Sequence, residues 1–130
     1  MSDNTEAKPY TIVFEDYPTY LYALVHGEQY DYDVIAAFLT EIASECRKRK
    51  FQSVLVEENI SATASPEDIA RAAKDLPEFG FSGIRMAYLD RFSEQKEMNE
   101  FGEDIAVDHG VDVKLFGDMA AADKWLTAQD

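Results

Sequence analysis

The sequence is poor in cysteine, histidine and basic residues, and each shortage excludes a class of structure or function. The single cysteine, Cys46, rules out an intrachain disulfide, and two histidines, His26 and His109, are too few for a three-histidine zinc site. Only 12 lysines and arginines stand against 26 aspartates and glutamates, which leaves a net charge of −14. Such a charge repels nucleic acids and anionic membrane surfaces, so neither is expected as a partner.

Long apolar runs and catalytic motifs are also missing. No stretch approaches the ~18 apolar residues of a membrane-spanning helix, and the polar, flexible tail expected over residues 1–9 lacks the apolar segment of a signal peptide. We therefore expect no membrane insertion and a cytoplasmic location. The chain has no Gly-x-Ser-x-Gly elbow, Walker sequence or dinucleotide-binding glycine pattern, so no catalytic residue and no cofactor is predicted.

What is present is a regular alternation of strand and helix patterns over residues 10–130, which are expected to form a single α/β domain. Period-two and β-branched segments predict strands over 11–15, 20–26, 51–57, 84–88 and 111–116. Apolar residues spaced by three and four predict helices over 32–50, 66–76, 93–108 and 119–126, with 58–64 as a polar loop. Helix N-caps are expected at Asp31 or Asp33, at Ser65 and at Asp118. Cys46 falls on the apolar face of the first helix, so a buried thiol is expected.

The predicted order is β-β-α-β-α-β-α-β-α. The short turn over 16–19 makes the first two strands an antiparallel hairpin, and the rest predict a mostly parallel five-stranded sheet with one antiparallel edge strand. Arg85, Asp112 and Lys114 interrupt the last two strands at period two, which indicates a sheet face without helices over it. Right-handed crossovers between sequential strands put the helices on the same side, so helices are expected mainly on one face. The alternative is a two-sided, flavodoxin-like sheet in which these are edge strands.

This pattern resembles the SpoIIAA-like, or STAS-like, proteins, which are related to bacterial anti-sigma-factor antagonists. The resemblance covers residues 10–128 and rests on the opening hairpin, the long first helix, the strand Val54–Val56 and the ending Phe116-x-Asp118 followed by Trp125-Leu126. It implies a superhelix of βα turns with the strands in chain order. It also implies a regulatory, protein-binding role. The same broad fold group includes lipid-binding Sec14-like domains, which implies a small apolar ligand as the alternative.

Anti-sigma-factor antagonists carry a phosphorylatable serine at the start of the helix after the third strand, in an Asp-Ser-Ser-Gly-like stretch. That stretch is absent here, and the hydroxyls available in the corresponding region are Ser61, Thr63 and Ser65. Phosphate on Ser65 would put negative charge at a helix N-terminus, where it is favoured, although Glu67 and Asp68 oppose it. The competing interpretation is that Ser65 only caps the helix.

Ligands of parallel α/β folds bind beyond the carboxyl ends of the strands. The residues expected there as a ligand or partner surface are His26, Glu57, Glu58, Asp90 and Arg91. Oxygen ligands from several acids could hold Mg²⁺ or Ca²⁺. The simpler interpretation is solvated or capping carboxylates, and no metal site is predicted.

Aromatic residues crowd the second strand and the loop after it: Tyr20, Tyr22, Tyr30 and Tyr32. On a one-sided sheet, half of them face away from the helices and form an interaction surface. The leading hypothesis is therefore a non-enzymatic STAS-like module that binds a protein partner or forms a homodimer. A carrier or sensor of a small apolar ligand or lipid is second, and an acid-cluster hydrolase or phosphotransferase is third.

Overall fold

The computed structural model describes residues 8–128, so the tail predicted over 1–9 lies almost wholly outside the described residues. The elements follow in the order β1 (Tyr10–Asp16), β2 (Leu21–Gly27), α1 (Tyr32–Lys48), β3 (Ser53–Ile60), α2 (Pro66–Leu76), the helical turn η1 (Pro77–Phe81), β4 (Arg85–Asp90), the short turn η2 (Ser93–Gln95), α3 (Lys96–Asp108), β5 (Asp112–Phe116) and α4 (Met119–Thr127). Within the described residues no helix is long and apolar enough to cross a bilayer.

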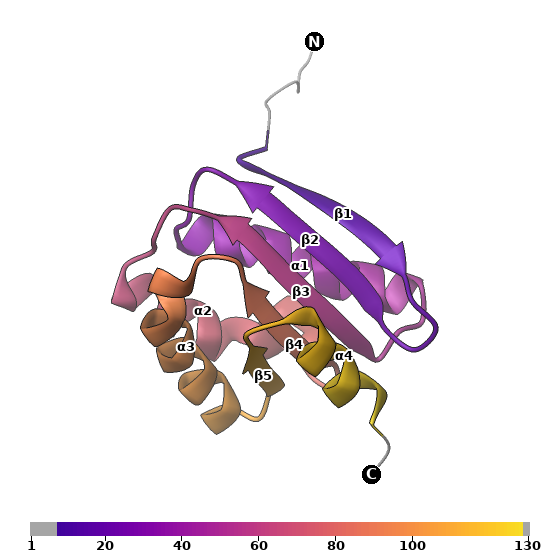
Figure 1. Ribbon diagram of the computed structural model, residues 1–130. Helices are drawn as coiled ribbons and strands as arrows, with labels where there is room; N and C mark the ends of the chain where they lie inside the picture. Colours follow the sequence, from indigo (N-terminus) through magenta and orange to yellow (C-terminus); the bar gives the residue numbers. More distant parts are fainter. Residues whose placement is uncertain (1–7, 129–130) are drawn as a thin grey trace.

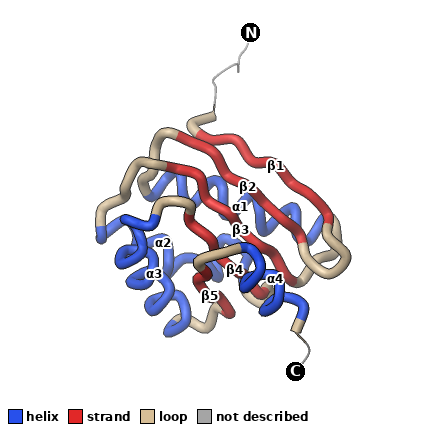
Figure 2. Tube along the Cα trace, in the orientation of Figure 1, coloured by secondary structure: helices blue, strands red, loops and turns tan. Residues whose placement is uncertain are grey.

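The five strands form one sheet in the order β1-β2-β3-β4-β5, as the sequence predicted (Figure 2). β1 runs antiparallel to β2, and the remaining neighbours are parallel. The tight turn between β1 and β2 forces the antiparallel pairing, whereas each later strand follows a helix that returns the chain to the same starting edge. The α/β fold class with one antiparallel edge strand is therefore confirmed.

Three helices bury their apolar stripes on one face of the sheet. Leu21, Val54 and Met86 contribute the strand side of this core, and Phe38 and Leu76 belong to the helices that cover it. Cys46 lies in the same core with no exposed surface, as expected. Burial raises the pKa of its thiol to about 12, so the thiol stays protonated and unreactive at neutral pH.

The fourth helix lies on the opposite face, in front of the sheet in Figure 1, where α1 and α2 lie behind it. Ala122 and Leu126 of α4 pack with Tyr20, Leu55 and Leu89, a second core separated from the first by the sheet. Helices lie mainly on one face, as expected, and α4 is the exception to the common side that crossover handedness indicates. The crossover rule applies to helices that lead into another parallel strand, and no strand follows α4 in the described residues.

The predicted helix starts are confirmed by their hydrogen bonds. Asp31, Ser65 and Asp118 are the N-caps of α1, α2 and α4, and each side chain accepts a bond from a backbone N–H three residues later. In α3 the apolar Phe101 is 41% exposed, and Ala106 is buried. Gly102 lets α3 approach α2 closely, because a β-carbon there would lie only 3.1 Å from the Ile69 side chain.

Two strand assignments also change. β3 continues to Ile60, through residues predicted to be a loop, and its last part is buried. The polar residues of the last strands do face away from α1–α3, but α4 covers part of that face: Arg85 stacks on Trp125 with its guanidinium 3.9 Å from the ring centre, and it pairs with Asp112 at 3.3 Å. The least covered part of this face lies instead over β1 and β2.

Candidate functional site

The residues predicted at the carboxyl ends of the strands do gather at one end of the sheet, but they divide between its two faces. Glu57 and Glu58 are consecutive in β3, and successive side chains of a strand point to opposite faces. Glu57 shares the α4 face with His26 and Arg91, and Glu58 shares the helix-covered face with Asp90. The predicted single acidic cluster is therefore split, and the described residues contain no group of three side chains suited to hold a metal ion.

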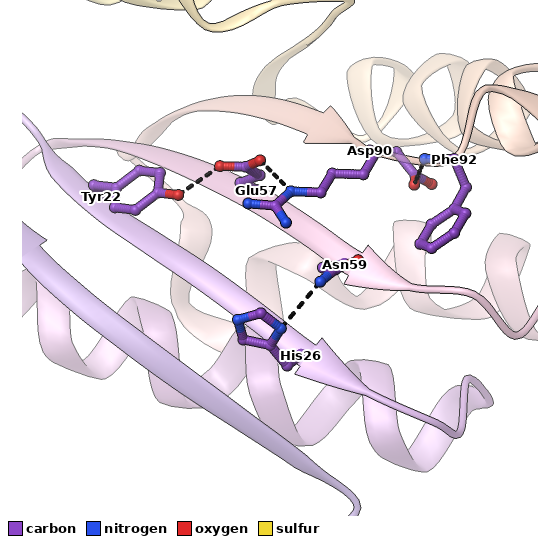
Figure 3. A network of polar contacts seen from close by, with 7 residues as sticks. Tyr22, His26, Glu57, Asn59, Asp90 and Phe92 are labelled. Atoms are coloured by element: carbon purple, nitrogen blue, oxygen red, sulfur yellow. Dashed lines mark hydrogen bonds and ion pairs between the residues drawn. The ribbon is translucent and has the colours of Figure 1, made fainter.

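On the α4 face, Glu57 is held by two neighbours (Figure 3). Its Oε1 accepts a hydrogen bond of 2.5 Å from the Tyr22 hydroxyl, and its Oε2 lies 2.6 Å from Nε of Arg91. The carboxylate is only 8% exposed, and its hydrogen bond raises the pKa of Arg91. With its charge paired in this way, Glu57 is not available as a free base or metal ligand.

Beside this chain of contacts, His26 meets Asn59 across β2 and β3 (Figure 3). The Nδ1 of His26 lies 3.1 Å from Nδ2 of Asn59, and because the amide nitrogen can only donate, the ring nitrogen accepts. His26 is half-buried at the edge of the uncovered face, where it can contact a partner.

On the face covered by α1–α3, Glu58 is the most deeply buried acidic side chain of the described residues. It has no exposed surface, and one of its oxygens, Oε2, accepts a hydrogen bond from the Tyr88 hydroxyl. The Tyr88 hydroxyl lies 3.3 Å from that of Tyr30. The second oxygen, Oε1, has no hydrogen-bond partner among the described residues. An ionised carboxylate in this position would be poorly stabilised.

The protonation of Glu58 follows from that burial. Loss of water raises the pKa of its carboxyl from 4.5 to about 8, and the nearby Asp90 adds to the rise, while the Tyr88 hydroxyl opposes it. Desolvation, together with Glu58, also raises the pKa values of Tyr30 and Tyr88. Glu58 is thus neutral in the folded protein at neutral pH and belongs to the core rather than to an accessible site.

Asp90, which was predicted beside Glu58, uses both carboxylate oxygens in hydrogen bonds within the chain. Its Oδ1 accepts from the backbone N–H of Phe92 at 2.9 Å, and its Oδ2 accepts from Nδ2 of Asn99 at 2.7 Å. These bonds link the end of β4 to the turn that follows it and to α3. Asp90 therefore orders the connection from β4 to α3.

The three predicted phospho-acceptors lie in and just after the connection from β3 to α2, and their surroundings differ. Ser65 is exposed, and its Oγ accepts a 3.1 Å bond from the N–H of Asp68, so it caps α2. Ser61 and Thr63 are exposed in the connection. Gln95 holds this connection, since its Nε2 lies 3.2 Å from the carbonyl oxygens of Ile60 and Ala62. Sequence reasoning missed Gln95, which is buried and carries no motif.

The predicted tyrosine surface is wrong in part. Tyr20 does face away from α1–α3, but it is buried beneath α4 and its hydroxyl donates to Asp123 at 2.7 Å. Tyr30 is buried on the face covered by α1–α3, and the Tyr22 hydroxyl donates a hydrogen bond to Glu57. The large apolar side chain exposed on the uncovered region is instead Val13, at 54%.

Two hollows among the described residues bear on the site. A cavity of about 80 Å³ lies between the sheet and α1–α3, lined mainly by apolar side chains such as Leu39, Leu76 and Met86. A larger crevice of about 650 Å³ opens at the carboxyl ends of β3, β4 and β5, and its lining includes Lys96 and Lys114. Neither lysine was selected as a site residue from the sequence. The signal available was Lys96 in the first turn of a helix, where the helix dipole disfavours a cation.

Comparison with known proteins adds no assignment. No model of a known protein family matches the chain, and no curated protein matches it.

Proposed function

We propose that this chain is a non-enzymatic, STAS-like interaction module of the bacterial cytoplasm that forms a homodimer or binds a protein partner. The observation that carries the proposal is the incomplete cover of the second sheet face. α4 packs on β3, β4 and β5, whereas over β1 and β2 the side chains of Thr11 and Val13 are exposed and those of Leu24 and His26 are half-buried. The sequential strand order, with helices α1–α3 on one face, supports the STAS-like part of the proposal.

The proposed contact surface consists of alternate residues of two neighbouring strands. Thr11 and Val13 of β1 lie beside His26 and Leu24 of β2 on the uncovered face. A β-branched apolar side chain at the centre and polar groups around it match the composition of a small interface. β1 is also the edge strand, so its outer backbone groups are free to pair with a further strand.

Self-association is tested by sedimentation equilibrium of the purified chain over a range of concentrations. We expect a concentration-dependent dimer that salt strengthens, because two chains of net charge −14 repel each other at low ionic strength. Val13→Glu should shift the protein to monomer. Val107→Glu is the matched control, since Val107 is 52% exposed on α3, away from this surface.

A protein partner is tested by placing a photo-crosslinking amino acid at position 13 or at position 107 in the producing cells. Discrete adducts at position 13 and none at position 107 support the proposal. A protein that stays monomeric at every concentration and gives the same adducts at both positions would contradict it.

The regulatory part of the proposal concerns Ser61, Thr63 and Ser65. Their exposure makes all three accessible to a kinase, and Ser65 occupies the start of the helix that follows β3, the place at which antagonists of anti-sigma factors are phosphorylated. Intact-mass analysis of the protein from its own cells tests this, and a persistently unmodified mass contradicts it.

The carrier of an apolar ligand is the weaker proposal. The cavity between the sheet and α1–α3 favours it, but its volume is about 80 Å³. An apolar cavity of ~150 Å³ holds one benzene molecule, so a lipid chain requires the helices to move apart. Native mass spectrometry should therefore give the mass of the chain alone, and a co-purified lipid would reverse the order of the two proposals.

A further inference from the structure

The crevice at the carboxyl ends of β4 and β5 lies where the chain changes faces. After β4 the chain passes to α3 on the face covered by α1–α3, and after β5 it passes to α4 on the opposite face. Two neighbouring parallel strands whose connections leave in opposite directions open a crevice between them, and this is where open α/β sheets bind ligands. Its volume of about 650 Å³ falls in the range of small-molecule sites.

The acidic and basic side chains of the crevice differ in how many hydrogen bonds and ion pairs they make within the chain. Most of its acids already accept hydrogen bonds from the protein: Glu57 from Tyr22 and Arg91, Asp90 from Phe92 and Asn99, Glu103 from Leu115, and Asp118 from Ala121. Lys96 and Lys114, by contrast, make no ion pair or hydrogen bond with residues 8–128. The neutral donors leave these acids charged, but Arg91 is paired with Glu57, so among the described residues Lys96 and Lys114 are the lining cations that remain free to contact a ligand.

Lys96 and Lys114 also contribute little to the stability of the fold. Lys96 is the first residue of α3, and a cation there is opposed by the positive end of the helix dipole. Lys114 is exposed on β5, and its nearest aromatic contact is the neighbouring Phe116 ring, 5.7 Å from Nζ. Among residues 8–128 neither lysine has an ion pair or hydrogen bond that accounts for its position, and such residues are candidates for ligand contact.

The crevice also has an apolar wall. Leu89 at the end of β4 and Phe116 at the end of β5 line it together with Met119 of α4. Phe116 packs against Trp125 with ring centres 5.5 Å apart, which holds it in place. A flat apolar group can therefore rest on Phe116 while a charged group reaches the lysines.

We propose that this crevice binds a small organic anion, with its carboxylate or phosphate held by Lys96 and Lys114 and its apolar body against Phe116. The negative charge of the surrounding protein restricts the ligand to a small molecule of low charge and excludes polyanions. This site does not overlap the surface over β1 and β2, so either can exist without the other.

The test is a titration of the full chain, labelled with ¹⁵N, with phenyl phosphate and with benzoate, followed by NMR. The two probes carry the two headgroups on the same ring. We expect saturable shifts of backbone amides around the crevice, for example those of Leu115 and Gly117, from at least one probe. Phenol, which has the ring without the charge, should give no saturable shift.

Variants distinguish binding at a defined site from nonspecific electrostatic attraction of the anion to the protein. Lys96→Gln and Lys114→Gln should each weaken the probe about tenfold, the effect of losing one charge-assisted hydrogen bond. Lys74→Gln, which removes an exposed lysine of α2 outside the crevice, should leave the affinity unchanged. Glu100→Gln should tighten binding, because Glu100 is a lining acid without a hydrogen bond to the described residues.

The absence of saturable shifts with both anions, or an equal loss of affinity in Lys74→Gln, would overturn the proposal. Equal binding of phenol and the anions would also overturn it, because the lysines would then contribute nothing. All four variants change exposed or lining surface residues, and dispersed amide spectra will verify that they fold.

Discussion

The burial of Glu58 predicts that the protein loses stability as the pH rises from acid to neutral, and that Glu58→Gln abolishes this loss. The pKa of the carboxyl is about 8 in the folded state and close to 4.5 when the chain is unfolded. The folded state therefore holds a proton that the unfolded state releases. This contribution to stability is fully present below about pH 4.5 and is lost progressively as the pH rises through about 8.

The size of the effect follows from linkage. Between the two pKa values the free energy of unfolding falls by up to ~1.4 kcal/mol per pH unit. From pH 5.5 to pH 7.5 the loss due to Glu58 is on the order of 2–3 kcal/mol, which is a large part of the stability of a small domain. A glutamine has nearly the same shape, accepts the Tyr88 hydrogen bond and carries no charge at any of these pH values.

Urea denaturation followed by the fluorescence of Trp125 measures the free energy of unfolding at pH 5.5, 6.5 and 7.5. Glu58→Gln should lie within about 1 kcal/mol of the original protein at pH 5.5 and exceed it by about 2 kcal/mol at pH 7.5. Glu100→Gln removes the same formal charge from an exposed position and is the control, for which a nearly constant difference is expected. If the difference between Glu58→Gln and the original protein stays flat over this range, Glu58 is ionised in the folded state and the reasoning fails.

Three further predictions concern single side chains. Ser65→Ala removes the α2 cap and should lower the free energy of unfolding by ~1 kcal/mol in urea titrations, whereas Ser61→Ala should leave it unchanged. The Cys46 thiol should react with a colorimetric thiol reagent only after unfolding, and rapid labelling of the native protein would contradict its burial. Tyr20→Phe should cost ~1 kcal/mol in the same titrations through loss of the bond to Asp123, and a neutral result would show that this bond does not stabilise α4.

The features read correctly from the sequence depend on neighbours in the chain. The caps at Asp31, Ser65 and Asp118 each involve an amide three residues away, so they could be predicted from local spacing. The hairpin and the parallel order follow from connection lengths. The buried position of Cys46 follows from the apolar face of one helix.

The candidate site was harder to predict, because its residues are defined by partners distant in sequence. Glu57 was predicted to end the strand and Glu58 to start a polar loop, yet both belong to β3, where Tyr22, Arg91 and Tyr88 supply their hydrogen bonds. Strand geometry then separates the two glutamates onto opposite faces, giving one an ion pair and the other a neutral, buried carboxyl.

The sequence by itself determined the order of the elements, their boundaries at capped ends and the strand order of the sheet, since these depend on local periodicity, turn residues and the handedness of crossovers. Only the tertiary structure decided on which face α4 lies, because within residues 8–128 no strand follows it to impose a direction. Because α4 packs on Tyr20, Leu55 and Leu89, a crevice opens beside Lys96 and Lys114. The same placement leaves the α4 side of β1 and β2 without a helix over it. The two surfaces proposed for function are thus consequences of long-range apolar contacts that no local pattern specifies.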